Sequence, residues 1–131
     1  MVLKVLLVED EALIALMAQD MIEGLGHEVA YTASSLKDAL DVCGRDFDCA
    51  LLDVNLNGDS SMPVAASLKL HGRPFAFTTG YGAGGVDDEH RDAPVLGKPY
   101  ALAELESMLD AFAAQLAGTS STTSSVDSNR G

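Results

Sequence analysis

Residues 2–11 read VLKVLLVEDE, an apolar run interrupted only by Lys4 and followed by three acidic residues. A nearly continuous apolar run of this length is typical of a strand that is buried on both faces of a sheet. Over residues 12–25, apolar side chains then recur at helical spacing, which predicts a helix that ends at Gly24 and Gly26. A buried strand followed directly by a helix is the repeating unit of a parallel α/β fold.

The rest of the chain repeats this alternation of strand and helix. Short apolar runs predict four further strands, at residues 27–31, 49–52, 75–78 and 94–96. A serine precedes the second and third helices as a cap (Ser34 or Ser35, and Ser60 or Ser61), and Asp38 is placed for a capping box with Ser35. The last helix carries one apolar stripe, formed by Leu102, Leu105, Leu109, Phe112 and Leu116. The pattern predicts a doubly wound α/β domain, with helices on both faces of a parallel sheet and right-handed crossovers.

Two segments depart from this pattern. Residues 80–93, where a fourth helix is expected, contain four glycines and offer only Val86 as an apolar anchor. Each glycine costs about 1 kcal/mol in a helix relative to alanine, so this helix is predicted to be short, frayed or mobile. After Leu116 the composition shifts to Ser and Thr with almost nothing to bury. Residues 1–117 are therefore predicted to form the domain and residues 118–131 a disordered tail.

Length and composition narrow the classes of function. A chain of 131 residues is long enough for one compact domain, and no apolar stretch approaches the roughly 20 residues that span a bilayer. No signal-type segment opens the chain, so a cytoplasmic location without a membrane partner is expected. The net charge of −12 argues against binding to nucleic acids, whose phosphates attract Lys and Arg. Cys43 and Cys49 are expected to be reduced, and His27, His71 and His90, which lack ligand spacing, to be exposed.

Chemically active side chains follow the predicted strands. The first strand is followed by three acids, Glu9, Asp10 and Glu11, and the third by one acid, Asp53. The fourth strand is followed by the hydroxyl of Thr79, and the fifth by Lys98. Sites in open parallel sheets form beyond the carboxyl ends of the strands, so these side chains are expected to gather at one edge. Taken singly, each has a simpler role: first-turn acids that favour a helix dipole, turn formers, or a solvated lysine. Their joint position favours a site.

This set of side chains suits phosphoryl transfer to a carboxylate. Clustered acids favour a hard cation, Mg²⁺ or Mn²⁺, which would neutralise charge on a phosphoryl group and orient it towards Asp53. Lys98 would supply a second positive charge, and Thr79 would donate a hydrogen bond to the phosphoryl oxygens. Gly80 leaves room for the leaving group of the donor.

Four strings, VLLVEDE, LLDVNL, FTTGYG and GKPY, together resemble the receiver domain of bacterial response regulators over about residues 2–117. The resemblance implies a CheY-like, flavodoxin-like (βα)5 fold with strand order 2-1-3-4-5. It also implies that Asp53 is the phosphoacceptor. Asp10 would bind the metal directly, Glu9 mostly through metal-bound water, and Asn55 through its backbone carbonyl.

The resemblance further implies that Thr79 is the switch hydroxyl, that Lys98 binds the phosphoryl group, and that the Lys98–Pro99 peptide is cis. Three features depart from the family pattern. Val95 stands where the family often carries an aromatic switch residue, the loop NLNGDS lacks the usual proline, and the glycine-rich segment replaces a well-formed fourth helix. The string PFAFTTGY is similar to an alphaproteobacterial receiver subgroup, often single-domain, that has alanine in place of Thr78. Tyr81 is a candidate to replace the missing aromatic switch.

The resemblance implies a stand-alone receiver that takes a phosphoryl group from a histidine kinase or phosphotransfer protein. Its signal would then leave through a downstream protein partner or by phosphorelay. A phosphate sink that drains a shared kinase is an alternative that the sequence leaves open. A degenerate receiver acting as a scaffold is disfavoured, because the acids, the acceptor and the lysine are all present. A magnesium-dependent phosphatase of the haloacid-dehalogenase type would carry an acid two residues after the nucleophile, where Asn55 stands. Apart from self-phosphorylation and slow loss of its own phosphate, no enzyme activity is expected.

Overall fold

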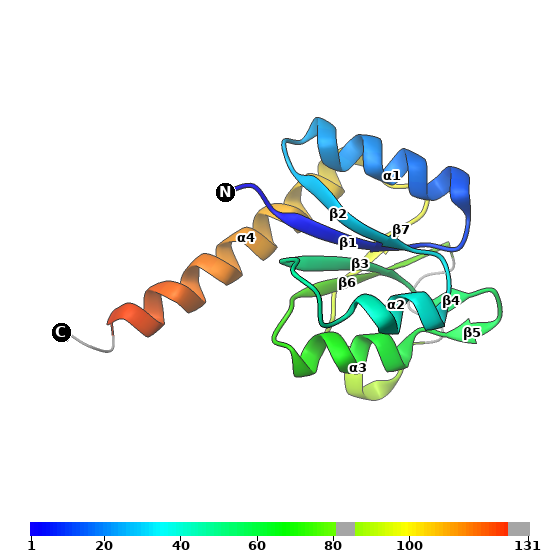
Figure 1. The fold of residues 1–131 in the computed structure, drawn as a ribbon. Coiled ribbons are helices and arrows are strands. Elements are labelled where there is room, and N and C mark those ends of the chain that lie inside the picture. The colour runs from blue at the N-terminus through cyan, green and yellow to red at the C-terminus, as the bar shows by residue number, and fades with distance from the viewer. Residues whose placement is uncertain (81–85, 126–131) are drawn as a thin grey trace.

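The computed structural model describes residues 1–80 and 86–125, with the backbone alone for residues 119–125. Five parallel strands form one sheet: β1 (Lys4–Val8), β2 (Glu28–Ala33), β3 (Cys49–Asp53), β6 (Phe75–Thr79) and β7 (Val95–Gly97). Their order is β2-β1-β3-β6-β7 (Figure 1). Because β4 and β5 lie outside this sheet, the order equals the expected 2-1-3-4-5 arrangement of five strands. The predicted α/β, flavodoxin-like fold is confirmed.

The helices cover both faces of the sheet, as the alternating pattern predicts. α1 (Ala12–Gly24) and α4 (Leu102–Ser125) pack on one face, and α2 (Leu36–Val42) and α3 (Met62–Leu70) on the other (Figure 1). Three residues of the stripe in the last helix are buried against the sheet, namely Leu105, Leu109 and Phe112, whereas Leu102 is exposed. No helix among the described residues is long and apolar enough to cross a membrane.

Serine side chains accept hydrogen bonds at the starts of two helices, although Ser61, the N-cap residue of α3, makes no side-chain cap bond. Ser35 Oγ accepts a hydrogen bond of 3.1 Å from the Asp38 amide, which confirms the cap predicted at the start of α2. Before α3, Ser60 Oγ accepts a hydrogen bond of 3.2 Å from the Met62 amide. α3 therefore begins directly behind the loop that follows the predicted phosphoacceptor, and its position depends on that loop.

A small hairpin follows β3. Its two strands, β4 (Asn55–Leu56) and β5 (Asp59–Ser60), are antiparallel and are joined by Asn57 and Gly58. Both turn residues have positive φ, 53° for Asn57 and 91° for Gly58. Asn-Gly is the preferred pair for a two-residue hairpin turn that requires this conformation. The hairpin extends beyond the carboxyl ends of the strands, next to the acidic residues.

The structure differs from the expected pattern in the segment between β6 and β7 and at the end of α4. In residues 86–93 the chain forms only a 3-10 turn, Asp88–His90, where a fourth helix is expected. Between β6 and β7, the described residues therefore contain one short 3-10 turn in place of the expected helix. Residues 81–85 lie outside the described residues. α4 continues to Ser125, beyond residue 117, where the sequence predicts a disordered tail. Extending an existing helix costs far less than starting one, which accounts for the extra turns. Residues 126–131 lie outside the described residues, so their disorder stays a prediction.

Candidate functional site

Three acidic side chains meet at the carboxyl edge of the sheet. Val8 at the end of β1 pairs with Leu52 near the end of β3, so the acids that follow them come out side by side. One carboxylate oxygen from each of Glu9, Asp10 and Asp53 lies within 4.8 Å of the other two. Glu9 and Asp53 are only 2% and 6% exposed. Their charges therefore need partners inside the protein.

Lys98 supplies that partner. Its Nζ lies 3.0 Å from Asp53 Oδ2 and 3.1 Å from Glu9 Oε1, and its side chain is 13% exposed. The lysine reaches the site because β7 pairs with β6: Thr79 lies opposite Gly97, and the Lys98 amide donates to the Thr79 carbonyl at 3.0 Å. The ammonium group of Lys98, which follows β7, thus bridges two of the three acids, Glu9 after β1 and Asp53 at the end of β3.

The electrostatics of the site follow from burial and from this bridge. Burial raises the pKa of Glu9 to about 7, although hydrogen bonds from the Glu11 amide and from Lys98 work against the shift. Burial would lower the pKa of Lys98, but its bonds to Asp53 and Glu9 outweigh that effect and hold the pKa above its usual value. The lysine therefore stays charged, whereas Glu9 changes its charge near neutral pH.

The hairpin touches the acids through its backbone. The Asn57 amide donates to Asp10 Oδ2 at 2.9 Å, and the Asn55 amide donates to Asp53 Oδ1 at 3.3 Å. Burial works to raise the pKa of Asp10, but the bond from Asn57 and those with Glu9 and Asp53 hold that pKa below its usual range. Asn57 was not among the residues predicted for the site, although the Asn57–Gly58 dipeptide is a hairpin signal in the sequence.

The remaining predicted site residues lie as follows. Thr79 ends β6 and is buried at the same edge. The Asn55 side chain accepts a 2.8 Å hydrogen bond from the Gly58 amide, so it is engaged within the hairpin. Glu11 is exposed and lies outside the group of three acids. Tyr81 lies outside the described residues, so its role as a switch stays a prediction. The Lys98–Pro99 peptide is cis, as expected.

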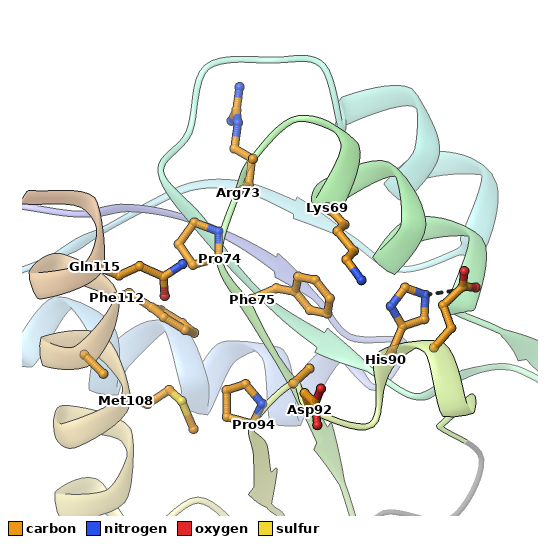
Figure 2. A pocket seen from close by; sticks show the side chains of 14 residues that line it. Lys69, Arg73, Pro74, Phe75, His90, Asp92, Pro94, Met108, Phe112 and Gln115 are labelled. Carbon is orange, nitrogen blue, oxygen red and sulfur yellow. Dashed lines mark ion pairs between the residues drawn. The ribbon is translucent and has the colours of Figure 1, made fainter. Parts of the chain in front are cut away.

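The expectation that all three histidines are exposed holds only for His71. His71 is exposed and His27 is half-buried, but His90 is buried, and its ring packs edge-on against Phe75 and Phe77 at 6.3 and 6.4 Å. It lines a hollow of about 490 Å³ at the amino ends of β6 and β7, in which Figure 2 shows Phe75 between His90 and Phe112. Aromatic packing that joins distant segments accounts for this burial. The hollow lies at the edge opposite the acids.

The acids fit a hard divalent cation. Three carboxylates within 4.8 Å repel one another, and the single ammonium group of Lys98 contacts two of them. Oxygen ligands at this density are those that Mg²⁺ and Mn²⁺ take in proteins. The donor set therefore suits the cation that the sequence predicts, and Glu9, Asp10 and Asp53 are the side chains that could hold it.

Comparison with known proteins adds the family. No family model and no curated protein matches the sequence. Among solved structures, the chain is similar to SdrG from Sphingomonas melonis Fr1, with 40% identity over 85% of this chain and 96% of that one and a TM-score of 0.75. The chain belongs to the response regulator receiver domains. A second structure, of the BeF3-activated conformation of SdrG from Pseudomonas melonis Fr1, matches with 40% identity over 81% of this chain and 94% of that one, TM-score 0.69.

Two further receivers are similar at lower identity. The PhyR response regulator REC domain of Erythrobacter litoralis is 25% identical over 85% of this chain and 89% of that one, with a TM-score of 0.73. A CheY-like receiver domain from Methylobacillus flagellatus is 25% identical over 86% of this chain and 99% of that one, also with a TM-score of 0.73. The predicted family is thereby confirmed, and with it a place in two-component signalling.

Proposed function

We propose that this receiver accepts a phosphoryl group on Asp53 from the phosphohistidine of a histidine kinase or phosphotransfer protein. The observation that carries the proposal is the Lys98 ammonium, 3.0 Å from Asp53 and 3.1 Å from Glu9, beside three clustered carboxylates. A buried acid held against a fixed positive charge, with cation ligands next to it, is equipped to stabilise a phosphoryl group in transfer.

The transfer step follows from the positions of these groups. A carboxylate oxygen of Asp53 attacks phosphorus, the bond between phosphorus and the donor nitrogen breaks, and an acyl phosphate forms while the imidazole leaves with the electron pair. Mg²⁺ or Mn²⁺ held by Glu9, Asp10, Asp53 and the Asn55 carbonyl would supply positive charge to the phosphoryl oxygens. Lys98 turns from the Asp53 carboxylate to these oxygens, and the Thr79 hydroxyl donates to another.

The surface beside the acceptor suits a protein donor. On α1 three large apolar side chains are exposed, namely Leu13, Leu16 and Met17. Met17 also lines a hollow of about 410 Å³ that reaches Lys98 and Tyr100. An apolar surface that borders the reacting groups allows a helical donor to dock with its phosphohistidine above Asp53. The signal would then leave by contact with a downstream protein or by phosphorelay.

Turnover of small phosphate esters is not part of this proposal. Such phosphatases need a general acid near the nucleophile, and the position two residues after Asp53 holds Asn55, whose side chain is bonded to the Gly58 amide. The acyl phosphate on Asp53 would instead decay slowly by hydrolysis, which suits a signal that must persist for a time.

Incubation with a small phosphoryl donor, acetyl phosphate, and Mg²⁺ tests the proposal directly. Intact-protein mass spectrometry should show one added phosphoryl group on the wild type and none on Asp53→Asn. Asp46→Asn is the matched control, because Asp46 is an exposed acid at the other edge of the sheet and should leave the reaction unchanged. Equal phosphorylation of the Asp53→Asn protein and the wild type would refute the assignment of the acceptor.

A further inference from the structure

Two hydroxyl groups near the acceptor are buried without a hydrogen-bond partner among the described residues. They are Thr78 Oγ1 and the Tyr100 hydroxyl. Thr78 is 1% exposed, and its strand β6 lies between β3, which ends at Asp53, and β7, which leads to Lys98. An unpaired buried hydroxyl has lost its bonds to water and gained nothing in return. Such groups are rare in folded proteins, and two of them close to a reacting group call for a functional explanation.

The two residues flank the reacting groups from neighbouring elements. Thr78 pairs with Asp53 across β3 and β6, and its carbonyl accepts a 3.2 Å hydrogen bond from the Val54 amide. Tyr100 follows Lys98 with only Pro99 between them, and it packs against the core on the α1 and α4 face. One hydroxyl is therefore tied to the acceptor strand and the other to the segment that carries the lysine.

The Tyr100 hydroxyl is within electrostatic reach of both Thr78 and the site. Burial raises the pKa of Tyr100 to about 12, the nearby Thr78 hydroxyl lowers it in part, and the charges of Glu9, Lys98 and Asp53 act on it as well. The Thr78 hydroxyl acts on the pKa of Tyr100 as a hydrogen-bond partner does, yet the two hydroxyls lie outside ordinary hydrogen-bond geometry. A small movement of residues 98–100 towards β6 would join them.

We propose that Thr78 and Tyr100 are positioning residues whose hydroxyls bond to each other when Asp53 is phosphorylated, and that this bond holds Lys98 on the phosphoryl oxygens. The inference rests on the proposed function. In the present structure Lys98 is bound by Asp53 and Glu9. When a phosphoryl group is added to Asp53, the ammonium must move to the new oxygens, and the chain at Tyr100 moves with it. A polar pair that is unsatisfied in one state and satisfied in the other favours the second state.

A purely structural role predicts the opposite pattern. If the two hydroxyls were bonded in both states, their removal would weaken the unphosphorylated fold and would leave its preference for the phosphorylated state unchanged. If the hydroxyl is unpaired, replacing its residue by an apolar residue of the same shape leaves the unphosphorylated fold as stable as before, or more stable. The sign of the stability change therefore separates the two roles.

The test uses Thr78→Val, Tyr100→Phe and the double variant, each of which keeps the side-chain shape. Binding of beryllofluoride, a mimic of the phosphoryl group, is titrated in saturating Mg²⁺ by amide NMR, and stability is measured by urea unfolding without beryllofluoride. Each single variant should bind beryllofluoride about 3- to 10-fold more weakly, the span of one ordinary hydrogen bond. The double variant should bind no more weakly than the weaker single variant, because both substitutions remove the same bond. Unfolding of the ligand-free proteins should not become easier.

Two comparisons decide the outcome. Tyr31→Phe removes a hydroxyl from a half-buried tyrosine on β2, away from the acceptor, and should bind beryllofluoride as the wild type does. Unchanged affinity in the Thr78 and Tyr100 variants, losses that multiply in the double variant, or a matching loss of ligand-free stability would overturn the inference. Any of these three outcomes refutes this inference alone, and leaves the proposed function standing, if the wild type binds beryllofluoride and the Lys98→Ala variant does not. If the wild type itself fails to bind, the proposed function falls together with the inference.

Discussion

The two edges of the central sheet differ in what they bury. At the carboxyl edge, the buried acids Glu9 and Asp53 are joined by two short ion pairs to Lys98, which is largely shielded from solvent. At the amino edge, the hollow of about 490 Å³ is lined by apolar side chains such as Phe75 and Phe112 together with charged ones such as Lys69 (Figure 2). One ion pair at that edge, Lys4 with Asp46, is exposed, with side chains 48% and 87% accessible.

This difference shows that the burial of charged groups, and not the size of a hollow, locates a site. The amino edge has a large open hollow, but its polar groups are mostly solvated and their charges are screened. The carboxyl edge has its charges out of water, so each of them changes the free energy of its neighbours strongly. Substitutions should therefore alter charge-dependent properties at the carboxyl edge and packing alone at the amino edge.

The largest effect on stability is expected for Lys98→Ala in the absence of divalent cations. It leaves Glu9 and Asp53 buried with no cation between them, and breaking a buried ion pair costs about 3 to 5 kcal/mol. Saturating Mg²⁺ should recover part of this loss, because the cation replaces the missing charge. Urea unfolding with and without Mg²⁺ measures both effects, and Lys4→Ala, at the exposed pair, should change stability by no more than about 0.5 kcal/mol. Equal losses for the two lysines would break the comparison.

The next largest effect is expected at the amino edge for Phe112→Ala. Phe112 is buried between α4 and the sheet and also borders the hollow, so the loss should lie near the lower end of the range for such changes, about 3 kcal/mol. Because no charge of the site is touched, the Mg²⁺ affinity of the folded protein should not change. Calorimetric melting and a Mg²⁺ titration below the melting temperature measure the two properties. A changed Mg²⁺ affinity would show that the edges are coupled.

The fold could be predicted from the sequence because its signals are local. Apolar runs marked the five strands, helical spacing marked α1 and α4, and each reactive residue directly follows or ends a strand. Parallel topology then brings residues as distant as Glu9 and Lys98 together without further information. The hairpin has a local signal as well, because Asn57–Gly58 is a strong turn dipeptide.

Long-range packing could not be predicted in the same way. The burial of His90 depends on Phe75 and Phe77, which come from a strand more than ten residues earlier in the chain. The closeness of the Tyr100 hydroxyl to Thr78 likewise depends on how far the segment after Lys98 turns towards β6. Neither contact leaves a periodic or a compositional trace in the sequence. Both arise from side-chain geometry that only the folded chain defines.

Mg²⁺ should stabilise the wild type through the carboxyl edge. A ligand that binds only the folded state adds about 2.7 kcal/mol at a hundredfold excess over its dissociation constant. Asp10→Asn removes one of the three clustered carboxylates and should abolish most of this gain, whereas Asp46→Asn at the amino edge should preserve it. Melting curves in Mg²⁺ and in a chelator measure the difference. A melting temperature that does not respond to millimolar Mg²⁺ would contradict the metal site.

The last effect is expected from pH and concerns Glu9. Its pKa is raised by burial from the ordinary value of 4.5 to about 7 in the folded protein. Between these values the folded state holds a proton that the unfolded state has released, so stability should fall as pH rises from about 4.5 to about 7 and then level off.

Other carboxylates also titrate in this range, so the measurement is the difference between the wild type and Glu9→Gln in a chelator. The substituted amide cannot ionise, and the variant should gain stability relative to the wild type as the pH rises. Asp10, whose depressed pKa favours stability at higher pH, is present in both proteins and cancels from the difference. A difference that stays constant from pH 4.5 to pH 8 would mean that Glu9 is already ionised throughout. In that case the attraction of Lys98 would fully offset the effect of burial on the Glu9 carboxylate.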